Sequence, residues 1–424
     1  MSIAKIASVK GRRVWDSRGR PTVEAEVTLA PGTVGRAIAP AGASRGGAEA
    51  VELRDGGAAH GGMGVDRAVA NVAVCGDALA GRDAADQSAI DHILIELDGT
   101  GDRSRLGANA MVAVSMAVAH AAAASHGVAL WRYLAGDSPV RLPLPEVQIF
   151  GGGAHAAARI DIQDVMVMPI GAASFDQAMV WCAEVYAAAG RLMADRGALA
   201  GVADEGGWWP AFETNEAALE AVVRSIHDAG LTPGSEMAIS LDIAATTLVE
   251  DGRYRLVRDG RIVDGDGMTE MLLDWCKRYP IRSIEDPLTE TNDDGMRRFT
   301  AAAGTGLQII GDDFLVTNAQ RVRQAAATGA GNAVLIKPNQ AGTLTEAKAA
   351  LDAAKTAGWG TIVSARSGES EDVTIAHLAV GWDAGQLKVG SFARSERMAK
   401  WNEVLRIAEA LGPDARYAGA DALP

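Results

Sequence analysis

Four short apolar runs in the second half of the chain each lead to a charged residue, and their spacing limits the folds available. The runs AISLD, IRSIED, LQIIGDD and AVLIK carry Asp242, Glu285, Asp312 and Lys337. The intervals between these charges are 43, 27 and 25 residues, and the last two intervals fit one strand, one helix and two loops. Successive parallel strands of a βα barrel place their carboxyl ends on one rim, so we expect the four side chains to lie together.

Three carboxylates and a lysine on one rim predict a metal-dependent site. Hard oxygen ligands suit Mg²⁺, and a lysine beside them is a candidate base with a lowered pKa. Two alternatives exist. An acid after a strand is also a common helix cap, and a lysine at the rim can be a salt-bridge partner without being a base. The coincidence of three acids with one lysine favours a metal site over separate caps.

The length of 424 residues predicts two domains, because one ordinary core does not grow that large. The segment TVEAEVTLA alternates as a strand does, and residues 65–135 have helical periodicity, which indicates an α+β domain. The segment GDSPVRLPLPE is the candidate linker, and strands and helices alternate after it. We predict an N-terminal α+β capping domain over 1–137 and a (β/α)8 barrel over 138–424.

Composition argues against several classes of protein. Hydrophobic residues make up 48% of the chain, which indicates a folded protein, and the net charge of -14 argues against a general nucleic-acid-binding surface. The N-terminal segment lacks the apolar core of a signal sequence, and no run of about 18 apolar residues is evident. We therefore expect a cytoplasmic protein without a membrane or nucleic-acid partner. The three cysteines lack metal-ligand spacing and are expected to be buried thiols.

Further polar residues occur in segments that suit an active site. Glu205 precedes two glycines that permit a sharp turn, so it is a candidate general acid or base, although plain loops have the same composition. Lys388, in AGQLKVG, has a strand-end setting and is a candidate partner for a substrate carboxylate. Arg366 and Ser367, in SARSGES, are either an anion-binding pair or a helix N-terminus with its capping serine.

Two glycine-containing loops are candidates for movement. His155 follows three glycines in FGGGAHA, which is typical of a mobile loop. Ser44, in APAGASRGGAEA, lies in a small-residue loop that is a candidate lid or anion-binding loop. Neither segment is specific when taken alone.

Taken in order, the motifs of this chain resemble those of the enolase (phosphopyruvate hydratase) family over nearly the whole length. The matching segments include VWDSRGRPTVEAEV, GGGAHAAA, ADEGG, SLDIA, YPIRSIEDP, GDDFLVTN, LIKPNQAGTLTE, SARSGESED and GQLKVGSFARSER. The resemblance implies an α/β protein of the enolase fold, in which an α+β cap covers a modified (β/α)8, TIM-like barrel with an antiparallel second strand. It also implies a homodimer or a higher homo-oligomer.

The resemblance implies a role for each matching residue. Lys337 would remove the proton α to the substrate carboxylate, and Glu205 would assist departure of the β-hydroxyl from the opposite face. Removal of that proton places two negative charges on one small group, so a lysine base works with one structural Mg²⁺ and a second Mg²⁺ that accompanies substrate. The implied metal-binding residues are Asp242, Glu285, Asp312 and, for the second ion, Ser44. The implied substrate-binding residues are His155, Gln163, Asp164, Arg366, Ser367 and Lys388.

Several departures from the family pattern lie near the expected site. Ala365 replaces the histidine of the family's S-H-R-S-G segment, and this change opens space. Arg45 replaces a threonine in the small-residue loop and adds a positive charge that is a candidate substrate contact. Both changes suit a substrate with an extra anionic or larger group. The remaining departures are Asp164 for glutamate, Pro338 for valine, and Trp208 and Trp209 for smaller residues.

These departures lead to one leading hypothesis and two alternatives. We expect a Mg²⁺-dependent lyase, or a related phosphonoenolpyruvate-forming enzyme, acting on a 2-phosphoglycerate- or phosphoenolpyruvate-like acid through an enediolate-type intermediate. A small phosphorylated or phosphonate substrate is expected, and a specialised role such as carboxyphosphonoenolpyruvate synthase in phosphinate or phosphonate antibiotic biosynthesis is favoured. The ordinary phosphopyruvate hydratase of glycolysis is the close alternative. A non-catalytic structural homologue is the third, but it predicts loss of metal ligands or base, and this chain retains them.

Overall fold

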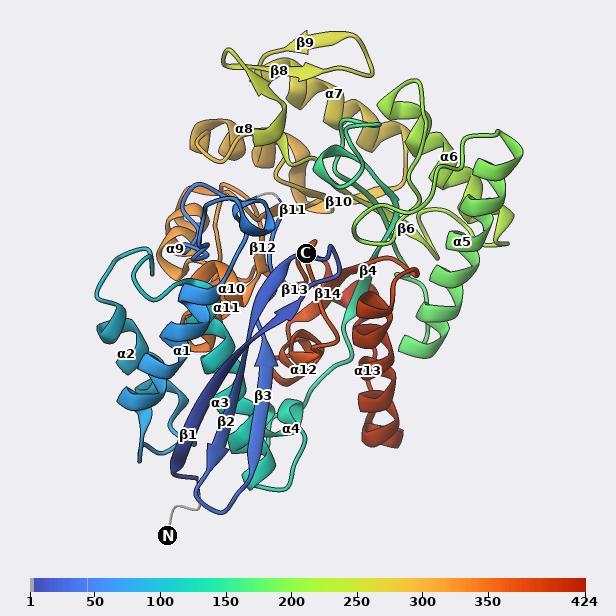
Figure 1. The fold of residues 1–424 in the computed structure, drawn as a ribbon. Coiled ribbons are helices and arrows are strands. Elements are labelled where there is room, and N and C mark those ends of the chain that lie inside the picture. The colour runs from blue at the N-terminus through green and yellow to red at the C-terminus, as the bar shows by residue number, and fades with distance from the viewer. Residues whose placement is uncertain (1–3, 44) are drawn as a thin grey trace.

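The N-terminal part of the protein combines a three-stranded antiparallel sheet with helices (Figure 1). The computed structural model describes residues 4–43 and 45–424. The strands are β1 (Ile6–Trp15), β2 (Pro21–Leu29) and β3 (Val34–Ile38), and the α-helices are α1 (Asp66–Leu79), α2 (Gln87–Asp98), α3 (Ala108–Ser125) and α4 (Leu130–Ala135). Strands followed by helices are the α+β order that the sequence predicted.

Helix α3 forms the centre of this part because its small side chains allow close packing. It is rich in alanine and valine and packs on both β2 and β3. A Cβ at Gly35 of β3 would lie 2.1 Å from the backbone nitrogen of Ala121, so only glycine permits this approach. By length and composition alone α3 resembles a membrane-spanning helix, but 83% of it is buried inside the protein. Its apolar character is therefore explained by the core.

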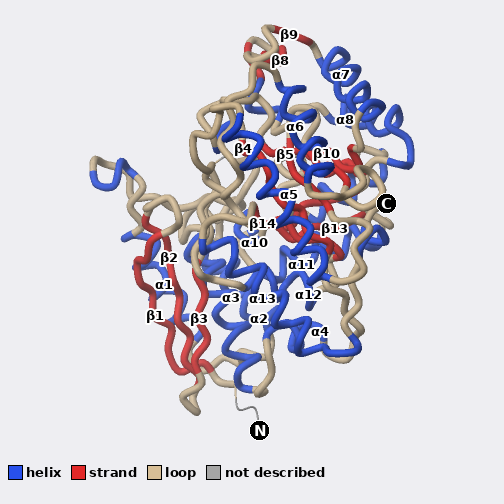
Figure 2. The backbone as a smooth tube through the Cα atoms, turned by 90° about the vertical axis from the view of Figure 1, so that its right-hand side faces the viewer, coloured by secondary structure: helices blue, strands red, loops and turns tan. Residues whose placement is uncertain are grey.

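Eight of the remaining strands form a closed barrel, which Figure 2 shows as red strands inside a layer of blue helices. The order around the barrel is β10-β11-β12-β13-β14-β4-β5-β6. Strand β5 pairs antiparallel with both neighbours, and the other pairs are parallel, which confirms the modified barrel with an antiparallel second strand. The barrel strands are β4 (Leu144–Gly151), β5 (Asp164–Met168), β6 (Ala238–Asp242), β10 (Ile281–Glu285), β11 (Gln308–Gly311), β12 (Ala333–Ile336), β13 (Gly360–Ser364) and β14 (Gly385–Gly390).

Helices follow most barrel strands, and a small sheet stands apart at the top of Figure 1. The helices are α5 (Phe175–Asp195), α6 (Asn215–Asp228), α7 (Gly265–Arg278), α8 (Asp293–Ala303), α9 (Ala319–Thr328), α10 (Pro338–Ala341), α11 (Leu344–Thr356), α12 (Thr374–Gly381) and α13 (Ser395–Leu411). The small sheet contains β7 (Val249–Glu250), β8 (Arg253–Leu256) and β9 (Arg261–Val263). Of the three cysteines, Cys75 and Cys182 are buried as predicted, whereas Cys276 is only partly buried.

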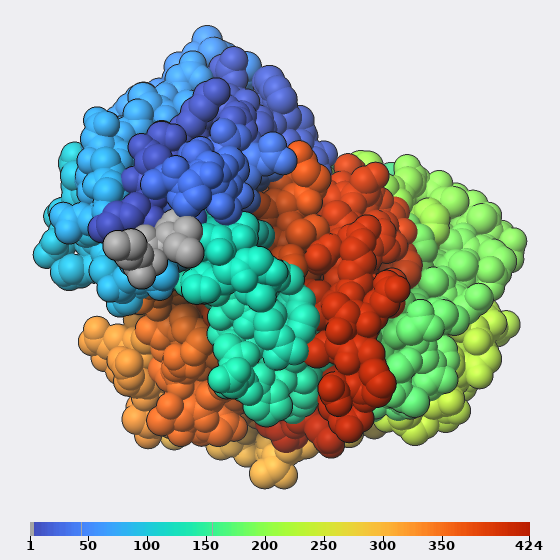
Figure 3. Space-filling view, turned by 90° about the horizontal axis from the view of Figure 1, so that it is seen from below, coloured from blue at the N-terminus to red at the C-terminus, as the bar shows by residue number. Residues whose placement is uncertain are grey.

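The N-terminal domain packs directly against the barrel, where Figure 3 shows the blue surface meeting the orange and teal surfaces. Ala41 and Gly368 exchange two backbone hydrogen bonds of 2.9 and 2.8 Å across this contact. The Ser17 amide also donates to the carbonyl of Glu369 at 2.7 Å. These bonds bring N-terminal loops to the barrel rim. The predicted boundary between 137 and 138 falls in the connection from α4 to β4 and stays a prediction.

Candidate active site

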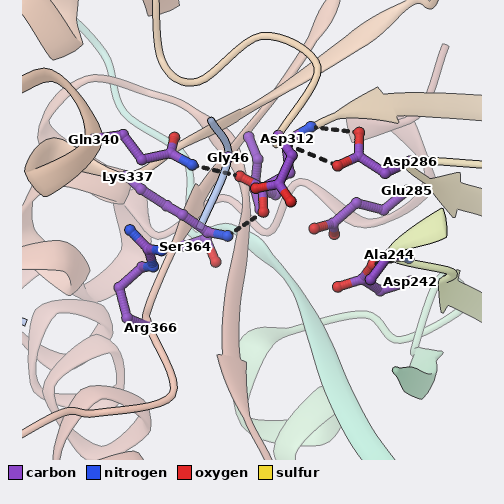
Figure 4. Close-up of polar contacts among 12 residues, drawn as sticks. Gly46, Asp242, Ala244, Glu285, Asp286, Asp312, Lys337, Gln340, Ser364 and Arg366 are labelled. Atoms are coloured by element: carbon purple, nitrogen blue, oxygen red, sulfur yellow. Dashed lines mark hydrogen bonds and ion pairs between the residues drawn. The ribbon is translucent and has the colours of Figure 1, made fainter. Parts of the chain in front are cut away.

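The four charged residues that first suggested a barrel rim lie close together in the structure (Figure 4). Asp242 and Glu285 are the last residues of β6 and β10, and Asp312 and Lys337 directly follow β11 and β12. All four side chains are buried. Parallel pairing of β6 with β10 sets Asp242 directly beside Glu285 in the register. The strand ends therefore bring these groups to one place, as their spacing predicted.

Two lysines lie among these carboxylates. The Lys388 ammonium is 3.0 Å from Asp242 Oδ2, 2.8 Å from Glu285 Oε2 and 3.3 Å from Asp164 Oδ2. Lys337 forms the corresponding ion pair with Asp312. Lys388 lies within β14, two residues before its last residue, and not at the strand end as the sequence suggested. Because β14 lies opposite β10 in the strand order, the Lys388 side chain reaches these acids through the barrel interior.

The antiparallel strand β5 explains how Asp164 reaches the same rim. Because β5 runs opposite to its neighbours, its first residue lies where their last residues lie, and Asp164 pairs with Asp242 in the register. The adjacent Gln163 donates from Nε2 to Asp242 Oδ2 at 3.0 Å. Gln148 of β4 donates to Asp164 and accepts the Gly207 amide at 2.9 Å. Sequence analysis missed Gln148, although its place in a buried barrel strand was a usable signal.

Glu205 is held at the site by the two glycines that follow it. Its backbone carbonyl accepts the Ser391 amide at 2.9 Å, and its side chain is buried. Gly206 has φ of 92°, and a Cβ there would lie 2.4 Å from the carbonyl oxygen of Ala393. The sharp turn therefore requires glycine, as the sequence predicted. Any side chain at position 206 would displace the segment that carries Glu205.

A small cavity of about 20 Å³ brings the candidate groups together. Its wall includes Lys337, Glu205, Lys388, Arg366, Ser367 and Ala365. Gln163, Asp164 and Asp242 also line it. Larger surface hollows exist elsewhere, but this one joins acids, lysines and an arginine with a hydroxyl. We therefore take it as the candidate active site, because converging polar groups that include titratable residues with shifted pKa values mark such sites.

Arg366 and Ser367 do not form a helix cap, and their side chains are held by residues of the N-terminal domain. Helix α12 begins at Thr374, so the alternative reading of a capping serine is wrong. The Arg366 guanidinium bonds both oxygens of Glu49 at 3.1 Å, and Ser367 Oγ accepts Arg18 Nη1 at 3.1 Å. Burial alone would lower the pKa of Arg366, but Glu49 outweighs burial and raises it. The segment therefore keeps its positive charge.

Buried groups around this segment come from distant parts of the chain and were missed by sequence analysis. The fully buried Arg397 of α13 donates to the carbonyls of Arg366 at 2.6 Å and Ser367 at 2.5 Å. Glu49 and Arg18 come from the N-terminal domain. No local pattern marks such residues, because their roles arise only when the two domains meet.

Mutual repulsion and burial dominate the electrostatics of the acids. Burial raises the pKa of Glu285 well above its usual value, and the nearby Asp242 carboxylate raises it further. Burial and then Asp312 raise the pKa of Asp313 to about 7. Burial would also raise the pKa of Asp312, but Lys337, Arg366 and Lys388 together lower it. The acids of the site therefore differ in how readily they ionise, according to the cations that they contact.

The predicted lowered pKa of Lys337 is wrong for this arrangement. Burial does act to lower the pKa, as expected for a desolvated ammonium. The Asp312 carboxylate, in direct contact, acts in the opposite direction with help from Glu285, and the net effect raises the pKa. The count of acids along the sequence did not reveal which of them would pair directly with the lysine.

The residues present fit a divalent cation. Glu285 Oε1 is buried and has no hydrogen-bond partner in the described part of the chain. A cation would satisfy this oxygen, since buried polar atoms are rarely left unpaired. Carboxylate oxygens of Asp286, Asp312 and Asp313 also lie within 4.8 Å of one another. Asp286, however, accepts the backbone amides of Asp312 at 3.0 Å and Asp313 at 2.8 Å, so its carboxylate already holds that loop in place.

Among the predicted site residues, Glu285, Asp312 and Arg45 are not in the wall of this cavity, although the lysines that line it contact Glu285 and Asp312. Ser44 and the side chain of His155 lie outside the described part of the chain. The Arg45 side chain is 51% exposed and 3.9 Å from Glu52, so the structure does not bring it into the cavity wall. The His155 backbone belongs to a 3₁₀ turn (Gly153–His155). The neighbouring carbonyl of Ala156 accepts the indole N–H of Trp209 at 2.7 Å, which ties this loop to one of the unusual tryptophans.

Comparison with protein families covers nearly the entire chain. Residues 6–134 match the family model described as the enolase N-terminal domain. Residues 139–424 match the family model described as the enolase C-terminal TIM barrel domain. The two matches follow the order of the two parts seen in the structure.

Proposed function

The chain belongs to the enolase family, and we propose that it is a Mg²⁺-dependent enzyme that removes the proton α to the carboxylate of a small phosphorylated acid. One observation carries this proposal. One cavity is lined by a candidate base, Lys337, and a candidate acid, Glu205. The same cavity is lined by two candidate anion-binding groups, Lys388 and the Arg366–Ser367 segment. The reaction requires a base, an acid and groups that bind the substrate's negative charges, and these side chains can supply all three.

Asp242, Glu285 and Asp312 are the proposed metal ligands. They offer hard oxygen atoms from three adjacent strand ends, which is the donor type that Mg²⁺ prefers. The unpartnered Glu285 Oε1 supports this choice over the Asp286 group, whose oxygens already accept backbone amides. When bound, Mg²⁺ supplies positive charge that stabilises the substrate carboxylate as it gains a second negative charge. Ser44 remains the proposed contact of a second Mg²⁺ that accompanies substrate.

The chain's own residues divide the proton transfers between them. Lys337 Nζ takes the α-proton, and the electrons of the broken C–H bond form the carbon–carbon double bond of the enediolate-type intermediate. Glu205 then gives a proton to the β-hydroxyl, which leaves as water. Lys388 binds the substrate carboxylate, and Arg366 with Ser367 binds the phosphate. Lys337 must lose its own proton first, which requires that Asp312 attract its ammonium less strongly than it does here.

The pocket wall supports a specialised substrate over 2-phosphoglycerate itself. Ala365 lies in the cavity wall with Gly42 and Ala43, so three small residues face the anion-binding segment. A histidine would fill space that alanine leaves open. A phosphorylated or phosphonate acid with an additional anionic group suits this wall, and a carboxyphosphonoenolpyruvate-forming role in antibiotic biosynthesis is our finest proposal. Ordinary 2-phosphoglycerate dehydration is the alternative, favoured by retention of Lys337, Glu205 and Lys388.

Turnover of 2-phosphoglycerate at saturating Mg²⁺, followed by absorbance of the product, tests this proposal. We expect rates well below about 10 s⁻¹, a typical enzyme value. Ala365→His should raise this turnover, whereas Ala365→Leu adds bulk without an imidazole and should not. In parallel, a phosphonate-bearing acid should bind the wild-type protein, and both substitutions should weaken this binding. Robust wild-type turnover of 2-phosphoglycerate would instead identify an ordinary hydratase.

Two broader properties are proposed from the family resemblance. We propose a homodimer or a higher homo-oligomer and a cytoplasmic location. The first is tested by sedimentation of the purified protein, where a single monomer species at micromolar concentration would contradict it. The second is tested by fractionation of the source cells.

A further inference from the structure

Lys388 contacts two of the three acids that we propose as metal ligands. Its ammonium lies 3.0 Å from Asp242 Oδ2 and 2.8 Å from Glu285 Oε2. Both acids are proposed metal ligands. Its third partner, Asp164 at 3.3 Å, is not a proposed ligand. The lysine therefore divides its contacts between two metal ligands and one separate carboxylate.

The charges of this buried cluster explain why the lysine is held there. Four carboxylates, those of Asp164, Asp242, Glu285 and Asp312, face the ammonium groups of two lysines. All are buried, and buried like charges are costly unless a cation lies between them. An ammonium within 3.3 Å of three carboxylates offsets part of this cost.

Asp164 is built as a fixed partner for that ammonium. Its carboxylate accepts the Gln148 amide, and Gln148 in turn accepts the Gly207 backbone amide at 2.9 Å. Both side chains are buried. A carboxylate anchored in this way can retain Lys388 after the other two acids have been taken by a different cation.

We propose that Lys388 is the built-in counter-ion of the metal site. Its ammonium stabilises Asp242 and Glu285 when no cation is bound, and it leaves them, retained by Asp164, when Mg²⁺ binds. The inference rests on the proposed function, because that function assigns the metal to these acids. A Mg²⁺ ion held by the remaining oxygens of these two carboxylates would lie close to the ammonium, and two cations at short distance in a buried site repel strongly. Lysine and metal therefore compete for Asp242 and Glu285.

Competition has a consequence for the order of binding. While the ammonium is held by Asp242 and Glu285, it is less available to a substrate carboxylate. Metal binding frees it, so the metal promotes binding of an anion that the lysine contacts. Such coupling is reciprocal, and a substrate carboxylate that draws Lys388 away should in turn strengthen metal binding.

Mg²⁺ titration of the full-length protein without substrate tests this inference. Calorimetry gives the affinity, and thermal melting in metal-free buffer gives the stability. Lys388→Met keeps most of the length of the side chain and removes the charge. We expect it to bind Mg²⁺ at least about tenfold more tightly than wild type, or about 1.4 kcal/mol. Its metal-free form should melt at lower temperature, because the acids lose their counter-ion.

Matched variants keep the test interpretable. Lys355→Met removes a partly buried lysine that contacts the Trp382 carbonyl at 2.9 Å, away from the cavity, and should leave Mg²⁺ affinity unchanged. If metal-free Lys388→Met does not fold, Lys388→Gln keeps a hydrogen-bonding group and should still bind Mg²⁺ more tightly. Equal or weaker affinity in a folded Lys388 variant overturns the inference and leaves the proposed function standing. Absence of Mg²⁺ binding to the wild type would overturn both.

Discussion

The interior of the barrel contains two regions that are built on opposite principles. One is an apolar cluster of β11, β12 and β13, formed by Ile310, Ala333, Leu335 and Ile362. The other is the charged cluster around Lys388, with acids from β5, β6 and β10. The apolar cluster stabilises the fold by burial. The charged cluster gathers like charges at a cost, and such clusters are typical of functional sites.

The comparison indicates that the residues that stabilise this barrel differ from those that carry out its proposed chemistry. Substitutions in the apolar cluster should reduce the free energy of unfolding without changing metal binding. Substitutions in the charged cluster should change activity or metal affinity more than stability. Single substitutions can test whether stability and chemistry change independently.

The largest effect is expected for Lys337→Ala. Loss of the proposed base should reduce turnover by about 10²- to 10⁴-fold, the usual contribution of a general base. The variant should still bind Mg²⁺, because Lys337 contacts Asp312 but is not itself a proposed ligand. Steady-state kinetics with the best substrate and calorimetry with Mg²⁺ provide the measurements. Activity that survives this substitution would exclude Lys337 as the base.

Ile362→Ala should lower stability while leaving chemistry intact. Ile362 is fully buried in the apolar cluster, and removal of such a side chain costs about 2–5 kcal/mol. Denaturant unfolding should show this loss, and the folded variant should keep the wild-type Mg²⁺ affinity. A large loss of Mg²⁺ affinity in folded Ile362→Ala protein would mean that the two regions are not separable.

Gly206→Ala should reduce activity through the position of Glu205. A Cβ at Gly206 would lie 2.4 Å from the Ala393 carbonyl, so the turn must shift and carry Glu205 with it. A shift of about 1 Å can cost about 100-fold in turnover. Gly197→Ala is the matched control, because Gly197 also has positive φ but no atom lies within 4 Å of an added Cβ. Equal activity of both variants would contradict the role of this turn.

The smallest effect is expected for Glu403→Gln, which lies outside both regions. The hydrogen bond with His377 lowers the pKa of Glu403 to about 2, assisted by Arg406 and opposed by burial. A lowered folded-state pKa stabilises the protein above the ordinary glutamate value near 4.3 and loses this effect as pH falls toward 2. The Glu403 side chain is 19% exposed and its partner Arg406 is 65% exposed, so solvent screening should keep the difference below about 1 kcal/mol.

Unfolding of wild type and Glu403→Gln across pH measures this contribution. The wild type should be more stable at pH 6, and the difference should vanish near pH 2. A difference that stays constant over this range would assign the effect to packing and not to ionisation.

The sequence predicted the barrel and its charged rim because both depend on local patterns. Apolar runs that end at Asp242, Glu285 and Lys337 are visible in a few consecutive residues. Gln148 and Arg18 were missed, since their contacts arise from barrel closure and from packing of the N-terminal domain. The pKa of Lys337 was wrongly predicted, because its sign depends on direct contact with Asp312 and not on the number of acids nearby.

The central claim is that Lys337 removes an α-proton in a Mg²⁺-dependent site. The most direct test is exchange of the α-hydrogen of 2-phosphoglycerate with solvent deuterium, followed by NMR for the wild type and Lys337→Ala. We expect the wild type to exchange the α-hydrogen only when Mg²⁺ is present, even where product forms slowly. We expect no exchange by Lys337→Ala. A folded, Mg²⁺-loaded wild type that gives no exchange, or exchange that persists without Lys337, would contradict it.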